Sequence, residues 1–494
     1  MIARKIFWAL AVFAFVVLGA AAVWLGGLNQ DEGWYLYAAN LCAEGKTLYK
    51  DFFYTQGPAM PSVYKSFVWI WDSWGLLGAR VFTLTLGFAG ILLAVGLARH
   101  LAPVERKGEA ALITFMLLGC NLYHLYYVAI PKTYALAALF VMVGLFLLAV
   151  GRSPLALIAA GLALAYAAGT RISLGGLLCV VGLGLLLAKR WKALLWFCIG
   201  GFGGLAIAYG PYLCDPAARA DLIAAQQYHA ARGGFDLVWA VGSLSRLVRW
   251  YLPMFVVLGL GVAAELIQNA NSRESGESPR MGVGVLLWGF LAVFAVQMMA
   301  PFPYEDYQVP IMGLLAVYAA VKLVSTASDS RRLLTMVILT LGLCFANSFG
   351  SPLLEKWMTN GQDRFWSLKK EKCEMAQLRD VAKRIEQQDP GGKDLLTQDL
   401  YLAIETGRRV PRGLEMGPFA MLTDGEWKTL LSGAPCAVAA LSGYTFAIEP
   451  PVCAERPIDK QMEYWGLLRK GYDLVDREEA FGQNATPLLI LKRK

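Results

Sequence analysis

Long apolar segments recur along most of this chain and are separated by short polar connections. A helix needs about 20 apolar residues to cross the hydrocarbon core of a bilayer, and the first segment meets that length. Several later segments are shorter, as expected for tilted, broken or partly buried helices. The expected spans are 6–28, 76–98, 110–128, 134–150, 155–169, 172–188, 193–213, 251–267, 282–300, 309–323 and 333–349. This pattern predicts a mainly α-helical, polytopic membrane bundle of about eleven spans.

The positions of basic residues orient this bundle. Arg4 and Lys5 precede the first span, so the positive-inside rule places the N-terminus in the cytoplasm. Every connection that then lies inside is basic; these connections hold Arg99, Arg106, Lys107, Arg152, Lys189, Arg190, Lys192, Arg273, Arg280, Arg331 and Arg332. An odd number of spans leaves the C-terminal region outside. We therefore expect a multi-pass protein of the inner membrane with an extracytoplasmic C-terminal domain.

The small residues Ala20, Ala21 and Ala22 resemble a signal-peptide cleavage site. The apolar run continues beyond them through Leu25, which favours an uncleaved anchor. In both cases the residues that follow lie outside.

Composition agrees with a membrane protein. The 494 residues are 57% hydrophobic, whereas soluble domains are about 45–50% apolar. The formal net charge of +8 comes mostly from the short connections, so it does not indicate a nucleic-acid partner. Cys436 and Cys453 can pair if their compartment is oxidising, and no cysteine spacing indicates a zinc site.

The chain divides into a membrane domain, 1–349, and a polar region, 350–494, whose alternating elements predict a small α/β domain. In this region we expect helices at 370–388, 424–431 and 460–470 and strands at 394–404, 436–441 and 487–492. Two outer connections, 29–72 and 214–249, are much longer than ordinary loops. The first is expected to form helices on the membrane surface. Together with the C-terminal domain, these connections are predicted to cover a site at the outer face.

An acidic pair, Asp31 and Glu32, follows the first span directly, and aromatic residues surround it in the sequence. Trp34, Tyr35 and Tyr54 are the candidates for sugar or acceptor binding. Carboxylates among aromatic rings are typical of carbohydrate sites, where rings stack on sugars and acids bind or deprotonate hydroxyls. The alternative is a solvated acidic pair beside an interfacial aromatic belt.

Basic residues also occur at the expected outer face, against the usual charge bias. They are Lys50, Lys132, Arg171, Arg246 and Arg249. A phosphate group at that plane explains them, since it accepts charge-assisted hydrogen bonds. The alternative is that they extend to lipid head groups in general. Arg171 is the sharpest case because it lies in a turn between two apolar segments.

A second polar cluster, Tyr304, Glu305, Asp306 and Tyr307, opens a late span and suits another wall of the same site. With Asp31 and Glu32, its acids are candidate ligands of a divalent metal ion, although their spacing does not require one. The Gly-rich stretch 200–204 lies inside a span and indicates close helix packing. The chain has no Walker A loop, no His-Glu-x-x-His and no Gly-x-Ser-x-Gly, which disfavours a nucleotide-using cytoplasmic enzyme.

Three sequence segments of the membrane domain resemble the C-type glycosyltransferases, close to the family 39 protein mannosyltransferases and the lipid A aminoarabinose transferase. They are Asn29-Gln30-Asp31-Glu32-Gly33-Trp34-Tyr35, Tyr49-Lys50-Asp51-Phe52-Phe53-Tyr54-Thr55-Gln56-Gly57-Pro58 and Tyr307-Gln308-Val309-Pro310. Glu405-Thr406-Gly407-Arg408 is similar, more weakly, to the tail domain of bacterial members.

This resemblance implies a transferase with a polyprenyl-phosphate sugar as donor and a lipid, glycan or protein as acceptor. It implies that Asp31 is the base or orients the acceptor, that Glu32 binds sugar or acceptor, and that outer basic residues hold the lipid phosphate. The chain departs from the pattern at Gln56, because aminoarabinose-type members often have a lysine before a proline pair there. Lys50 or Arg171 can substitute for that lysine, and Gln56 is itself a candidate contact to substrate.

Two other functions remain as alternatives. A lipid-linked glycan polymerase or ligase uses related chemistry, although such enzymes often place the site in a late loop. A transporter or flippase is also a helical bundle, but it often has repeated halves and charges near the midplane. This chain has no evident repeat, and its charges gather at one face.

Overall fold

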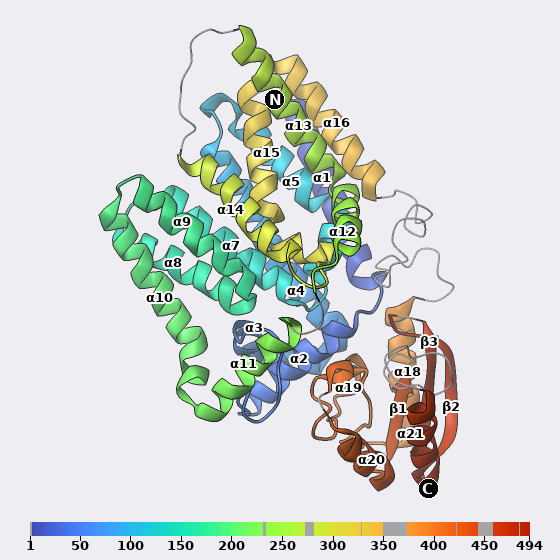
Figure 1. Ribbon diagram of the computed structural model, residues 1–494. Coiled ribbons are helices and arrows are strands. Elements are labelled where there is room, and N and C mark those ends of the chain that lie inside the picture. Colours follow the sequence, from blue (N-terminus) through green and yellow to red (C-terminus); the bar gives the residue numbers. More distant parts are fainter. Residues whose placement is uncertain are drawn as a thin grey trace.

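The computed structural model describes residues 2–230, 234–271, 281–327, 329–348, 373–420, 422–442, 458–483 and 485–494. It consists of a helical bundle and a smaller C-terminal region that contains a sheet (Figure 1). The expected boundary between the two, at 349/350, lies outside the described residues, as do Arg273, Arg280 and Cys453. The N-terminus lies at one end of the bundle, and the C-terminal region lies at the other end (Figure 1).

Each predicted span contains a helix. The helices are α1 (Ile2–Trp24), α4 (Val68–Leu101), α5 (Lys107–Gly119), α6 (Leu122–Ala129), α7 (Thr133–Val150), α8 (Pro154–Thr170), α9 (Gly175–Leu187), α10 (Trp191–Cys214), α13 (Leu252–Asn271), α14 (Met281–Met298), α15 (Met312–Thr326) and α16 (Ser330–Ser348). Within the described residues, 5 helices are long and apolar enough to cross a membrane, or up to 7 if each bent pair counts as one span. Shorter apolar helices account for the remaining predicted segments.

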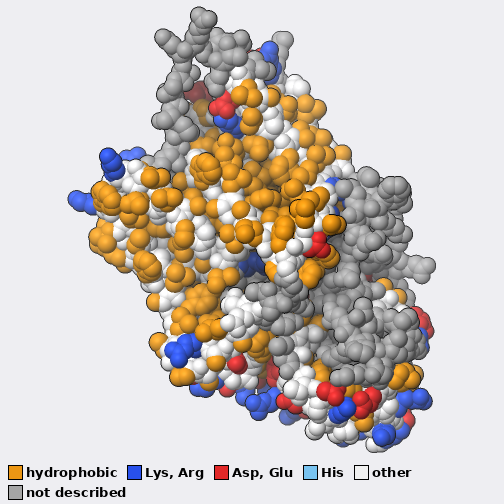
Figure 2. Space-filling model, viewed as in Figure 1, with side chains coloured by type: hydrophobic (Ala, Val, Ile, Leu, Met, Phe, Trp, Pro, Cys, Tyr) orange, Lys and Arg blue, Asp and Glu red, His pale blue; other side chains and the backbone are white. Residues whose placement is uncertain are grey.

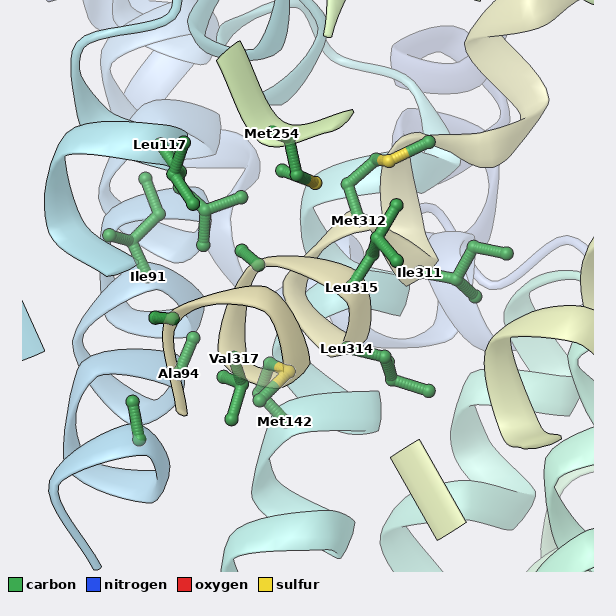
Figure 3. Packing of buried hydrophobic residues seen from close by; sticks show 14 of the residues in the cluster. Ile91, Ala94, Leu117, Met142, Met254, Ile311, Met312, Leu314, Leu315 and Val317 are labelled. Carbon is green, nitrogen blue, oxygen red and sulfur yellow. The ribbon is translucent and has the colours of Figure 1, made fainter. Parts of the chain in front are cut away.

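The core of the bundle lies around α15, whose span is 83% buried. Met312, Leu314 and Val317 of this helix have no exposed surface, and Figure 3 shows them packed with Met142 of α7 and Ile91 of α4. Outward-facing residues of the bundle are apolar as well. Figure 2 shows hydrophobic side chains over the bundle surface, whereas charged side chains gather on the C-terminal region. A helix that is apolar on all sides suits lipid contact, so the bundle is that of a multi-pass membrane protein.

Glycines bring α8 and α10 close together, as the Gly-rich stretch predicts. A Cβ atom at Gly200 would collide with the backbone of Ile158, and one at Gly161 would collide with the backbone of Phe197. Gly203 lies on the other side of α10, where a Cβ atom would meet nothing within 4 Å. Small residues at a helix interface allow the backbones to approach, which is the usual means of packing helices in lipid.

The first long connection folds into α2 (Gln30–Ala43), α3 (Ala59–Tyr64) and the 3-10 helix η1 (Lys65–Phe67) before α4 begins. Gly75 bends α4, and its φ of 62° is a conformation that side chains other than glycine rarely adopt. The second long connection contains α11 (Pro216–Ala230) and α12 (Leu237–Trp250). α12 meets α13 at an angle of 80°, so it crosses the end of the bundle.

The C-terminal region contains α18 (Glu374–Gln388), α19 (Leu400–Thr406), α20 (Asp424–Gly433), α21 (Ile458–Gly471), β1 (Val438–Ser442), β2 (Tyr472–Phe481) and β3 (Thr486–Arg493). The strands form an antiparallel sheet in the order β1-β3-β2.

One prediction for this region was wrong, and one strand was not predicted. The expected strand 394–404 contains only isolated bridges and then the helix α19, because its short apolar run suits either structure. The strand β2 was missed because its sequence is rich in Asp and Glu, and its pairing with β3 is through the backbone.

Candidate active site at the α2 end of the bundle

The first turn of α2 carries Asp31. Asn29 caps this helix, and Glu32 completes a capping box by accepting a hydrogen bond from the Asn29 backbone nitrogen, so the turn is fixed locally. Oδ1 of Asp31 accepts a hydrogen bond of 3.1 Å from Nε1 of Trp34. Oδ2 lies 2.9 Å from Nζ of Lys132, and 28% of the Asp31 side chain remains exposed. Asp31 is therefore an oriented carboxylate that a substrate can still reach.

Lys132 joins Asp31 to the second acidic cluster. It occupies the position just before α7, and its Nζ lies 3.3 Å from Oδ2 of Asp306 in the 3-10 helix η4 (Glu305–Ile311). The same carboxylate oxygen accepts a hydrogen bond of 2.8 Å from the Tyr134 hydroxyl. Lys132 and Asp306 are almost fully buried. One buried ammonium group thus bridges two carboxylates that are far apart in the sequence.

Arg171 lies beside this bridge, in the turn between α8 and the 3-10 helix η3 (Ile172–Leu174) that precedes α9. Its guanidinium lies between the rings of Tyr134 and Tyr307, with centroids 5.0 and 4.7 Å away, and donates to Oγ1 of Thr133. Its Nε atom is buried without a hydrogen-bond partner, and no carboxylate of the described residues forms an ion pair with it. A buried donor without a partner costs about 1–3 kcal/mol of stability. An anion bound beside Arg171 would accept this hydrogen bond and remove that cost.

Arg246 and Glu305 form a separate pair. Nε of Arg246, on α12, lies 2.9 Å from Oε2 of Glu305, which also accepts a hydrogen bond from Ser243. Arg249 lies over the ring of Trp250, 4.6 Å from its centroid, and Tyr304 packs against Tyr307. The amphipathic α12 therefore holds η4 in place through an ion pair.

Glu32 has surroundings quite different from those of Asp31. Both of its oxygens accept hydrogen bonds from Arg80 of α4, at 2.6 and 2.7 Å, and neither side chain has any exposed surface. Arg80 also donates to the carbonyl oxygens of Val23, Gly26 and Gly27, where α1 ends. This buried pair fixes the turn between α1 and α2. Our sequence reasoning missed Arg80, although an arginine inside an apolar span is itself a signal.

Aromatic side chains pack behind Asp31. Trp34 and Tyr35 are stacked with centroids 3.7 Å apart, and Tyr54 meets both rings edge-on. Burial, and then the charge of Asp31, raise the pKa of Tyr35, so its hydroxyl keeps its proton. Tyr54 is fully buried. Trp34 and Tyr35 are only 3% exposed, so the three rings form a packed wall beside the carboxylate.

Lys50 and Gln56 contact residues of the two long connections. Nζ of Lys50 is exposed and lies 2.8 Å from Asp215, at the end of α10. The Gln56 carbonyl oxygen accepts a hydrogen bond from the Tyr49 hydroxyl.

The four acids considered as metal ligands do not gather at one point. Lys132 bridges Asp31 and Asp306, Arg80 holds Glu32, and Arg246 holds Glu305. Throughout the part of the chain that the structure describes, no group of three or more His, Cys, Asp or Glu side chains is arranged to hold a metal ion.

The arrangement provides a partly exposed carboxylate paired with Lys132, and a second cation, Arg171, that packs on Tyr134 and has a buried donor without a partner. Such a carboxylate can take a proton from a hydroxyl group, and the cations can stabilise an anionic leaving group.

No model of a protein family matches this sequence, and no curated protein matches it. The structure is similar to ArnT from Cupriavidus metallidurans in the apo state, with a TM-score of 0.61 and 15% identity over 99% of this chain and 98% of that chain. ArnT bound to undecaprenyl phosphate gives a TM-score of 0.60 and 13% identity over 99% and 97%. The Archaeoglobus fulgidus oligosaccharyltransferase, tethered with an acceptor peptide containing the NVT sequon, gives 0.50 and 11% over 96% of this chain and 73% of that chain. The chain therefore has the fold of ArnT over almost its whole length, in agreement with the resemblance of its loop motifs.

Proposed function

We propose that this protein is a membrane glycosyltransferase that moves a sugar from a polyprenyl-phosphate donor to a hydroxyl group of a cell-envelope lipid, glycan or protein. Its active site is at the α2 end of the bundle, on the extracytoplasmic side of the inner membrane. The observation that carries the proposal is the pairing of the accessible Asp31 carboxylate with Lys132, in a molecule with the fold of ArnT. The ArnT complex with undecaprenyl phosphate supports the class of donor.

Asp31 acts as the base in this scheme. The acceptor oxygen attacks the anomeric carbon and forms the new glycosidic bond, while the bond from that carbon to the donor phosphate breaks. Polyprenyl phosphate leaves with the electron pair of the broken bond, and Asp31 takes the proton of the acceptor hydroxyl. A positioned base of this kind contributes roughly 10²–10⁴-fold to the rate.

Arg171 and Lys132 hold the phosphate of the donor. Negative charge increases on this phosphate as the bond to the sugar breaks, so cations fixed beside it favour the transition state. The unpartnered Nε atom of Arg171 supports this role, since a phosphate oxygen would satisfy it. We assign Lys50 to a structural pair with Asp215 instead, because its ammonium group is on the surface.

An apolar hollow offers room for the lipid chain of the donor. It has a volume of about 670 Å³ and lies between α9 and α14, where Val180, Leu187 and Trp288 line it. α9 begins just after Arg171, and a hydrogen bond from Gln297 to Ser173 joins α14 to this end of α9. A chain whose phosphate lies at Arg171 can therefore follow the seam between these helices into the bilayer.

The remaining candidates form the walls of the site. Trp34, Tyr35 and Tyr54 are almost fully buried, so they support the Asp31 turn on the side of α2. Asp306 and Tyr307 belong to the other wall. Asp306 pairs with Lys132, and the ring of Tyr307 packs against Arg171. We assign positioning roles to Glu32 and Glu305, because arginine side chains hold both of them.

Mass spectrometry of envelope lipids and glycans tests the proposal. Cells that express the protein should contain a glycosylated product that is missing when the gene is absent and when Asp31→Asn replaces it. Asp51→Asn is the matched control, since this carboxylate belongs to the same connection but only accepts a local hydrogen bond from Thr47. A donor lipid that accumulates on one side of the membrane without any product would favour the transporter alternative and overturn the proposal.

A further inference from the structure

The C-terminal region holds the turn that carries Asp31. Three hydrogen-bond donors at the start of α2 find their acceptors there. The Leu28 backbone nitrogen donates to Oε2 of Glu374, and the Gln30 backbone nitrogen donates to Oε1 of Gln483 at 2.9 Å. Nε2 of Gln30 donates to Oδ1 of Asp399 at 2.6 Å. The first backbone donors of a helix lack partners within the helix, so these acceptors fix the start of α2 from outside the bundle.

The packing around these bonds is tight. A Cβ atom at Gly33, two residues after Asp31, would collide with the backbone of Leu400 and Tyr401 in α19. Asp399 is fully buried and also accepts a hydrogen bond from the Tyr401 hydroxyl. α2 and α19 are therefore pressed together at the residues that flank the proposed base.

We propose that Asp399 is a positioning residue for Asp31: through Gln30 it holds the first turn of α2 so that the Asp31 carboxylate stays against Lys132. The inference rests on the proposed function, and it makes the C-terminal region part of the catalytic apparatus. Arg80 and Glu32 hold the same turn from the bundle side. Asp31 is thus clamped between two supports, of which only Arg80 and Glu32 belong to the membrane domain.

Kinetics of the purified full-length protein with a polyprenyl-phosphate sugar test this role. Asp399→Ala should lower kcat by about 10-fold to 10²-fold, because a displacement of about 1 Å at a reacting group has effects of this size. The KM for the donor should change little, since Arg171 and Lys132 remain. Asp399→Asn keeps an acceptor oxygen for Gln30 and should restore most of kcat. A merely structural residue would not separate kcat from KM in this way.

Two further variants complete the experiment. Gln30→Met removes the same hydrogen bond from the α2 side and replaces Asp399→Ala if that protein does not fold; it should lower kcat to a similar extent. Glu44→Gln is the matched control, because it breaks the exposed ion pair with Arg409 that joins the same region to the other end of α2. It should leave kcat unchanged.

The inference is overturned if Asp399→Ala and Gln30→Met have the kcat of the unmodified protein, if Asp399→Asn is as impaired as Asp399→Ala, or if Glu44→Gln is equally slow. Asp31→Asn separates this failure from a failure of the proposed function. If Asp31→Asn is inactive while the Gln30 and Asp399 variants are normal, only the positioning role is wrong. If Asp31→Asn is fully active, the proposed base is wrong.

Discussion

Asp31 and Glu32 are neighbours in the chain, and their surroundings are opposite. Consecutive residues of a helix point in directions about 100° apart, so one can face a substrate while the other faces the core. Asp31 is 28% exposed and lies beside Lys132, whereas Glu32 is completely buried against Arg80. A buried carboxylate with a bidentate arginine partner is held too firmly to act on substrate. We therefore propose a chemical role for Asp31 and a supporting role for Glu32.

Arg171 and Lys50 are expected to differ in their effect on donor binding. Arg171→Ala should raise the KM for the donor by at least about tenfold, because a charge-assisted hydrogen bond contributes about 1.5–3 kcal/mol. Lys50→Ala should leave KM unchanged, since Lys50 pairs with Asp215 on the surface. Initial rates at varied donor concentration measure both effects. Equal changes in the two variants would contradict the assignment of the phosphate site.

Asp31 and Arg171 stand out in the sequence, because an acid after a span and an arginine in a short outer turn are local signals, and the structure gives both residues contacts in the cluster around Lys132 and Tyr134. The sequence was not sufficient to separate Glu32 from Asp31, since the partner that decides the matter, Arg80, is 48 positions away. The surface ion pair of Lys50 was hidden in the sequence for the same reason. Its partner, Asp215, comes from the second long connection, and no local pattern links the two.

The helices follow from composition, whereas their contacts depend on single residues. Every predicted span contains a helix because a long apolar run in a bilayer has few alternatives. The segment that forms α19 was predicted as a strand. A short, continuous apolar segment has no periodicity that distinguishes a buried strand from a buried helix. The packing of α8 on α10 depends on the position of the glycines around the helix, which the Gly-rich stretch indicates only in part.

Alanine substitutions at Gly200 and Gly203 test the packing of α8 on α10. Gly200→Ala should lower the midpoint of thermal unfolding in detergent, because the added methyl group would meet the backbone of Ile158. Gly203→Ala should keep or raise the midpoint, since its Cβ atom meets nothing and alanine favours the helix. If both variants unfold at the same temperature, close approach at Gly200 does not stabilise the bundle.

In the whole molecule, the bundle and the C-terminal region meet at α2. Glu405 of α19 accepts a hydrogen bond from the Leu76 backbone nitrogen in α4, and the Val410 backbone nitrogen donates to the Tyr37 hydroxyl. The sequence predicted a C-terminal domain above the site, but it contained no sign of these bonds, which join residues more than 300 positions apart.

The pH dependence of thermal stability tests the burial of Asp399, which lies where the C-terminal region contacts α2. Burial raises the pKa of Asp399, although Gln30 and Tyr401 lower it in part, so the folded protein holds this proton more tightly than the unfolded chain. The resulting stability is complete below the unfolded pKa of about 3.9 and is lost as the pH rises through the higher folded pKa. Asp399→Asn does not titrate. The Tm of the unmodified protein relative to this variant should therefore fall as the pH rises above about 4, and a constant difference would contradict the burial of a titrating carboxyl.

The most direct test of the account is the transfer rate of Asp31→Asn in proteoliposomes with a defined polyprenyl-phosphate sugar and its acceptor. Asparagine keeps the shape of the side chain and removes the base. We expect kcat to fall by at least about 10²-fold, with a normal elution profile and a normal KM for the donor, while Asp51→Asn keeps full activity. Full activity of Asp31→Asn would contradict the central claim that Asp31 is the base of a glycosyl transfer.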